Sequence, residues 1–148
     1  VLALDTIKNP FLAHIDNVDR LFNRTLGKAS YQAIWDTIAA APDGSTFIVD
    51  AWFGFQPLEL LDAGLASAGV TRVAEIWCEA PGDVLAARYG ARLDHRLPGH
   101  PGAEYIPELV ALAARATPAG RGPVHRLDTT LPPADDLLAG WVKRQFDR

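Results

Sequence analysis

The sequence predicts an α/β fold in which helices cover both faces of a parallel sheet. Four short apolar runs of strand length each end at an acidic residue, at positions 1–4, 46–49, 73–78 and 124–127. Segments with helical spacing or helical end signals lie between these runs. Because strands that alternate with helices are joined by crossover connections, we predict a three-layer arrangement around one parallel sheet.

Six helices are expected, over residues 7–18, 30–41, 57–68, 81–93, 107–116 and 134–146. Ser30 is the expected N-cap of the second, and a Pro-Asp-Gly turn follows that helix. The third opens on Pro57 and stops before Gly69, in the usual order of Pro at the start and Gly at the end. The stretch 94–104 holds two Pro and two Gly, which predicts an ordered or mobile flap.

Composition restricts the class of protein. The chain has 148 residues and 16.0 kDa, so residues 1–148 are expected to form a single domain. Its net charge of −4 argues against a general nucleic-acid binder, and no apolar run approaches the ~20 residues of a membrane span. No leader is visible, and the one cysteine excludes an internal disulfide. A soluble, cytoplasmic protein is expected, with no signal for its oligomeric state.

Three aspartates mark the expected ligand crevice. In an open parallel sheet, ligands bind outside the carboxyl ends of the strands, and Asp5, Asp50 and Asp128 follow three of the predicted strands. The alternative is that each one only caps a helix or forms a turn. The turn alternative is weakest for Asp50, because the run Ala-Trp-Phe-Gly-Phe that follows it does not have the composition of a turn.

Several segments resemble the small-molecule kinases of the P-loop NTPase superfamily, of the gluconate-kinase-like and chloramphenicol-phosphotransferase-like kind. The run APGDVLAARYGAR leads into LDHRLPGH after a strand that ends Trp-Cys-Glu, and this is similar to their fourth strand, helix and lid. LALDTIK resembles their second strand, FIVD their third strand with its Walker-B acid, and LDTT their last strand and nucleotide-base loop. In this order the resemblance covers essentially the whole chain and implies a P-loop kinase type of sheet, with a lid at about 93–104.

One defining element of that superfamily is missing from the 148 residues. No G-x-x-x-x-G-K-[ST] motif occurs, and Gly27-Lys28-Ala29-Ser30 is interpreted as a turn followed by an N-cap. The chain also contains no Met and opens directly in an apolar run. The hypothesis that accounts for both facts is an N-terminally incomplete domain that lacks the first strand and phosphate loop, about 30 residues. A degenerate relative that lost the loop is the alternative.

The resemblance assigns the acceptor side of the site. Asp5 is the expected general base that orients the acceptor hydroxyl, with a helix N-cap as its alternative role. Lys8, one turn further, would reach an anionic group, or else be a solvated surface lysine. Asp50 is expected to hold Mg²⁺ through a water molecule. Trp52 is a candidate wall for a ring-shaped substrate or else a core residue, whereas Phe53 and Phe55 are expected to pack in the core.

Three arginines and the last strand complete the predicted site. Arg88, Arg92 and Arg96 are spaced by four residues, so on one helix they would share a face and could meet phosphate. The alternative is a solvated face with partners such as Asp83 or Asp94. By resemblance, Arg88 and Arg92 act on the transferred group, and Arg96 and His100 contact substrate. The resemblance also places Asp128 and Thr129 at the nucleotide.

These assignments predict an ATP- and Mg²⁺-dependent phosphotransferase that acts on a hydroxyl of a small molecule, a sugar or sugar-like compound. A non-catalytic binding or regulatory domain is the alternative, because nothing in these residues cradles the β- and γ-phosphates. A nucleotide or an antibiotic as acceptor is a lower alternative.

Overall fold

The computed structural model describes residues 1–132 and 134–147 and forms two compact units. Unit 1 contains Val1–Val70 and Arg92–Tyr105, and unit 2 contains Thr71–Ala91 and Ile106–Arg148. The helices and strands of unit 1 are β1 (Leu2–Ala3), α1 (Leu4–Leu12), α2 (Arg20–Ala39), β2 (Val49–Asp50) and α3 (Leu58–Ser67). Those of unit 2 are β3 (Glu75–Glu79), α4 (Gly82–Gly90), α5 (Ile106–Arg115), β4 (Val124–Asp128) and α6 (Asp135–Phe146). Short 3₁₀ turns lie at Phe53–Phe55, Leu93–His95 and Ala103–Tyr105.

The strands pair in parallel, which confirms the mixed α/β class. In unit 1, β1 pairs with β2 through Leu2 opposite Val49 and Ala3 opposite Asp50. In unit 2, β3 pairs with β4 over all five residues, from Glu75 opposite Val124 to Glu79 opposite Asp128. All four strands fall on the predicted apolar runs or at their ends. A single three-layer sheet through the whole chain stays a prediction, as does the single domain.

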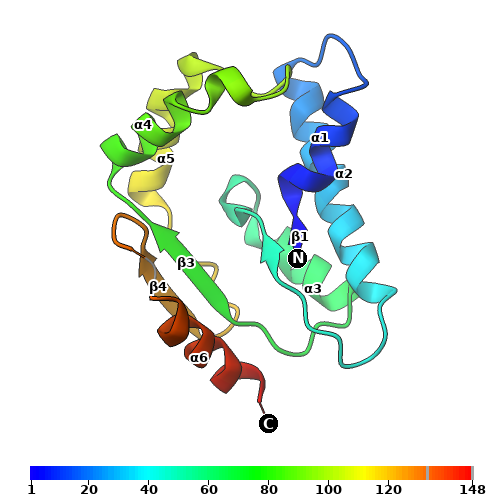
Figure 1. Cartoon of the computed structure of the whole chain (residues 1–148). Helices are drawn as coiled ribbons and strands as arrows, with labels where there is room; N and C mark the ends of the chain where they lie inside the picture. The colour runs from blue at the N-terminus through cyan, green and yellow to red at the C-terminus, as the bar shows by residue number, and fades with distance from the viewer. Residues whose placement is uncertain (133, 148) are drawn as a thin grey trace. The chain divides into compact units, whose positions relative to one another are not determined.

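The core of unit 1 lies along α2, which runs beside α1 and packs against α3 (Figure 1). Ile34 is completely buried, and Gly64 of α3 lies directly against the Trp35 indole, where any side chain would collide. The Phe53 ring lies 5.1 Å from Tyr31 and 5.9 Å from Trp35. Phe53 therefore packs as predicted, while the side chain of Phe55 lies outside the described part of the structure.

The start of α2 differs from the prediction. The helix begins at Arg20, ten residues before the expected N-cap, and the Asp19 carboxylate caps it by accepting the Phe22 N–H at 2.7 Å. Ser30 is buried inside the helix, and its hydroxyl donates to the Leu26 carbonyl at 2.8 Å. A serine satisfied by the carbonyl four residues earlier needs no helix end. The segment 27–30, expected as a turn, is thus helical as well.

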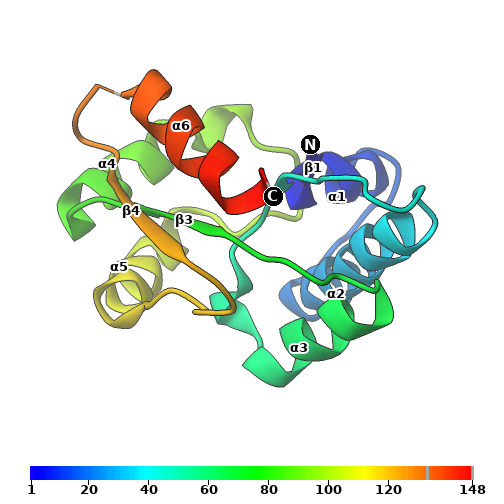
Figure 2. The same ribbon diagram turned by 90° about the horizontal axis from the view of Figure 1, so that it is seen from below.

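Unit 2 is built around the longer strand pair. Figure 2 shows β3 and β4 side by side, with α5 and α6 on opposite sides of the pair. The His125 ring of β4 lies 5.1 Å from the Trp141 ring of α6. On the other side, α4 packs on α5, and Gly82 permits a close approach because a side chain there would meet Val110.

None of the helices in residues 1–132 and 134–147 is both long enough and apolar enough to cross a membrane.

Candidate functional site

Two of the predicted aspartates leave the same end of the β1–β2 pair. Asp50 ends β2 in register with Ala3, and Asp5 lies two residues after Ala3 in the first turn of α1. The N-cap of that helix is Ala3, which has no side-chain cap, so Asp5 does not cap the helix. The Asp5 side chain is 59% exposed, and its carboxylate is accessible to a ligand.

Lys8 is buried, contrary to the surface-lysine alternative. It is 8% exposed, and its Nζ donates to Asn23 Oδ1 of α2 at 3.0 Å. Burial lowers the pKa of Lys8, the Asp5 carboxylate opposes this shift, and the Arg96 guanidinium adds to it. Asn23 in turn donates through Nδ2 to the Gly99 carbonyl. This chain of bonds links α1, α2 and the lid segment, residues 93–104.

The lid segment brings two predicted residues to Asp5. Arg96 Nη2 lies 3.9 Å from Asp5 Oδ2 and 3.0 Å from His100 Nδ1. The other ring nitrogen of His100, Nε2, lies 2.9 Å from Asn9 Oδ1 on α1. Burial lowers the pKa of His100 to about 4, with the positive charges of Arg96 and Lys8 adding to the effect and Asp5 opposing it. The imidazole is therefore neutral near pH 7.

Trp52 joins this region through its backbone. The Tyr31 hydroxyl donates to the Trp52 carbonyl at 2.6 Å. Burial, and then the negative charge of Asp5, raises the pKa of Tyr31 to about 12, so this phenol stays protonated. The Trp52 indole lies over Gly54, where a side chain would collide with the ring. Its predicted use as a wall for a ring-shaped substrate stays a prediction.

The site thus contains residues that sequence reasoning did not select. Asn9 follows Asp5 by four positions, and this helical spacing was a usable signal for a shared face. Asn23 and Tyr31 lie within the long helix α2, where nothing in the local pattern separates them from ordinary helical residues.

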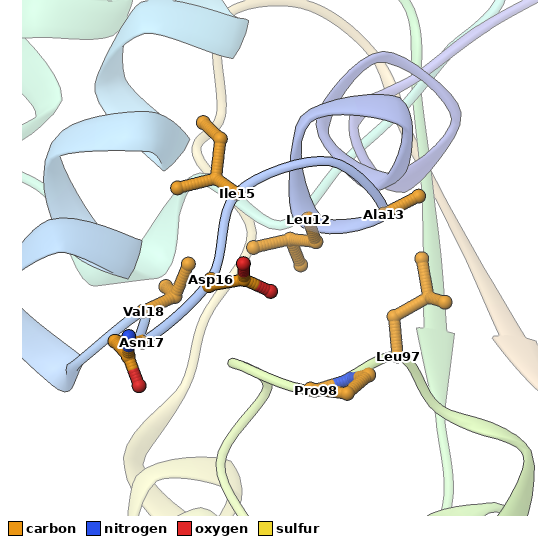
Figure 3. Close-up of a pocket in the computed structure, with 8 residues that line it drawn as sticks. All are labelled: Leu12, Ala13, Ile15, Asp16, Asn17, Val18, Leu97 and Pro98. Atoms are coloured by element: carbon orange, nitrogen blue, oxygen red, sulfur yellow. The ribbon is translucent and has the colours of Figure 1, made fainter.

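A pocket of about 250 Å³ lies within unit 1, beyond the C-terminal end of α1. Figure 3 shows the chain from Leu12 to Val18 on one side of it and Leu97 with Pro98 on the other. Asn9 lies three residues before the first of these segments and His100 two residues after the second, so the pocket lies close in sequence to the bonded pair Asn9 and His100.

Three predicted site residues of unit 2, Arg88, Asp128 and Thr129, lie at or contact the loop that follows β4. Arg88 of α4 donates to the Thr129 hydroxyl at 2.8 Å and to its carbonyl at 2.7 Å. The Asp128 carboxylate accepts the Thr130 hydroxyl at 2.7 Å and its backbone N–H at 2.8 Å. These bonds lower the pKa of Asp128, and the Arg88 charge contributes in the same direction. Arg88 and the loop after β4 therefore form one structural element.

The predicted arginine stripe does not lie on one helix. α4 ends at Gly90, Arg92 comes directly before the turn Leu93–His95, and Arg96 follows that turn. Glycine is a poor helix former, and the tighter turn breaks the four-residue spacing. Arg88 belongs to unit 2, whereas Arg92 and Arg96 belong to unit 1.

Within the described part of the chain, no group of three or more His, Cys, Asp or Glu side chains is placed to hold a metal ion.

No family model matches this chain, and no curated protein sequence matches it. A solved structure does, described as a "putative kinase" from Chloroflexus aurantiacus J-10-fl. The TM-score is 0.81 at 25% sequence identity, over 97% of this chain and 82% of that chain. The fold is therefore a mixed α/β fold similar to that of a protein described as a kinase.

Proposed function

We propose that this chain provides the acceptor side of a phosphotransferase that moves a phosphoryl group from ATP to a hydroxyl of a small molecule, a sugar or sugar-like compound. The observation that carries the proposal is the accessible Asp5 carboxylate beside Arg96 and the buried Lys8. This group stands where the parallel strands β1 and β2 end, which is where ligands bind in α/β sheets. Similarity of the fold to a protein described as a kinase supports the same reaction class.

Asp5 acts as the general base in this proposal. Its carboxylate accepts the hydrogen of the acceptor hydroxyl and so directs an oxygen lone pair towards phosphorus. As the new oxygen–phosphorus bond forms and the bond to the leaving group breaks, the hydroxyl proton passes to Asp5. Its exposure leaves room for the hydroxyl to approach.

Lys8 and Arg96 supply the positive charge. Both side chains are partly or fully withdrawn from water, with Lys8 8% and the Arg96 side chain 23% exposed. Charges held in such surroundings interact more strongly with a negative group than they would in bulk water. They are therefore suited to an acceptor or phosphoryl oxygen that gains negative charge during transfer.

Asp50 fits the predicted role towards magnesium. It is an exposed carboxylate at the end of β2, and Mg²⁺ in phosphoryl-transfer sites usually keeps several waters and takes few protein ligands. When bound, Mg²⁺ would neutralise phosphate charge. Asp128 and Thr129 are the candidates for the nucleotide, and Arg88 and Arg92 remain candidates for the transferred phosphoryl group. The 148 residues contain no G-x-x-x-x-G-K-[ST] loop, so the roles assigned to this chain centre on the acceptor.

The decisive experiment is a phosphorylation assay on the protein expressed from its complete gene, with ATP, Mg²⁺ and a panel of sugars, nucleosides and antibiotics. Asp5→Asn should lower kcat by about 100-fold or more, the usual contribution of a general base. Asp43→Asn, at an exposed turn of the same unit, is the matched control and should leave kcat unchanged. Unchanged turnover in Asp5→Asn would remove Asp5 as the base.

A non-catalytic binding or regulatory domain is the second candidate, favoured by the missing phosphate loop. It predicts that the protein binds small hydroxylated compounds, measured by calorimetry, and forms no phosphorylated product with any member of the panel. If only a nucleoside or an antibiotic is phosphorylated, that class of compound, and not a sugar, is the acceptor.

A further inference from the structure

We propose that Asn9 and His100 are positioning residues that hold the Arg96 guanidinium beside Asp5 without letting it close on the carboxylate. The role in turnover rests on the proposed function, whereas the arrangement itself is a property of unit 1. His100 was predicted to contact substrate, but both of its ring nitrogens already have partners within the chain.

The chemistry of the partners determines the direction of each hydrogen bond. A guanidinium only donates, so His100 Nδ1 must accept from Arg96 Nη2 at 3.0 Å. In a neutral imidazole the proton then lies on Nε2, which donates to Asn9 Oδ1 at 2.9 Å. Asn9 therefore selects the tautomer that allows His100 to hold Arg96.

The backbone beside His100 is held independently. The Gly99 carbonyl accepts a hydrogen bond from Asn23, which also accepts from the buried Lys8. Gly99 has a φ of +90°, and any side chain there would collide with Val18. The segment that carries the imidazole is therefore hydrogen-bonded to α2 through Asn23, and Asn23 is bonded to α1 through Lys8.

The distance between Arg96 and Asp5 leaves the Asp5 carboxylate open to an acceptor. At 3.9 Å, Nη2 and Oδ2 are farther apart than hydrogen-bonded atoms. Asp5 therefore keeps its lone pairs for an acceptor hydroxyl, while the positive charge stays close. Without the pull of His100, Arg96 would close on Asp5 in the hydrogen-bonded geometry that arginine and carboxylate prefer, and would occupy the lone pairs that take the acceptor proton during transfer.

Acid should undo the arrangement. The charged groups around His100 are Asp5 and Lys8 on α1 and Arg96 on the lid segment, and the contact from α2 in this network comes from the neutral Asn23. A protonated imidazole has no acceptor for Arg96 and adds positive charge beside two cations. Arg96 would then leave His100.

Nuclear magnetic resonance on ¹⁵N-histidine-labelled protein tests the hydrogen bonds from Asn9 through His100 to Arg96 without an activity assay. The wild type should show His100 as the Nε2–H tautomer at pH 7, titrating near pH 4. Arg96→Gln should raise the pKa of His100, and Asn9→Ala should weaken the preference for that tautomer. His125 of unit 2, which takes no part in these hydrogen bonds, is the internal reference. An Nδ1–H tautomer, or a titration unaffected by Arg96→Gln, would overturn the proposal.

Kinetics test the role in turnover. Asn9→Ala and His100→Gln should each lower kcat by about 10- to 100-fold with little change in KM, the usual cost of a misplaced group. Neither should lower it further in an Arg96→Gln background, and His95→Gln should match the wild type. A raised KM with unchanged kcat would assign His100 to the substrate and overturn the positioning role. If no phosphorylation occurs at all, the proposed function fails. The resonance experiment still tests whether Asn9 and His100 hold Arg96.

Discussion

Lowering the pH from 7 to about 4.5 should destabilise this protein through His100 in particular. The unfolded chain protonates this imidazole below its ordinary pKa of 6.5, whereas the folded chain does so only near pH 4. Between these values the unfolded state binds more protons. The contribution of His100 to stability is therefore complete above pH 6.5 and is lost as the pH falls towards 4.

The magnitude follows from the distance between the two pKa values. At about 1.36 kcal/mol per pH unit, a shift from 6.5 to about 4 corresponds to about 3 kcal/mol. His100 is only partly buried, and solvent screening reduces this to about 2 kcal/mol. Most of that loss should already be present at pH 4.5.

Urea unfolding followed by tryptophan fluorescence at pH 7 and pH 4.5 measures the effect. Acid also protonates carboxylates, so the quantity of interest is the difference between variants. His100→Gln has no titrating group at this position and should lose about 2 kcal/mol less than the wild type between the two pH values. His95→Gln should behave as the wild type. Equal losses in wild type and His100→Gln would mean that His100 does not cause the acid sensitivity.

Two further predictions concern the packing that holds the site. Gly99→Ala should lower the free energy of unfolding by about 1–3 kcal/mol, because alanine is strained at a φ of +90° and meets Val18; a urea titration at pH 7 measures this. Asn23→Ala should cost about 2–3 kcal/mol, since it leaves the buried Lys8 ammonium without its partner, whereas Lys8→Met should cost about 1 kcal/mol. A larger cost for Lys8→Met than for Asn23→Ala would show that the lysine stabilises the fold rather than serving a ligand.

Local signals were enough to place most elements of the fold. The expected helices at 57–68, 107–116 and 134–146 begin and end within about one residue of α3, α5 and α6. For α3 the reason is that Pro57 at the start of the helix and Gly69 after its end act within one turn. The strand pairs lie at the ends of the apolar runs. Helix α2 was misplaced because a buried serine bonded to its own helix looks, in sequence, like a cap.

Two features of the site follow from the sequence alone: which carboxylates follow strands, and that Lys8 lies about one turn after Asp5. These are properties of neighbours along the chain, which local geometry controls. Tertiary packing buries Lys8 against Asn23 and brings His100 to Asn9 from 91 positions away. Such contacts depend on how a loop rich in Gly and Pro packs on distant helices. No periodicity of residue types encodes that packing, and the candidate site became visible only in three dimensions.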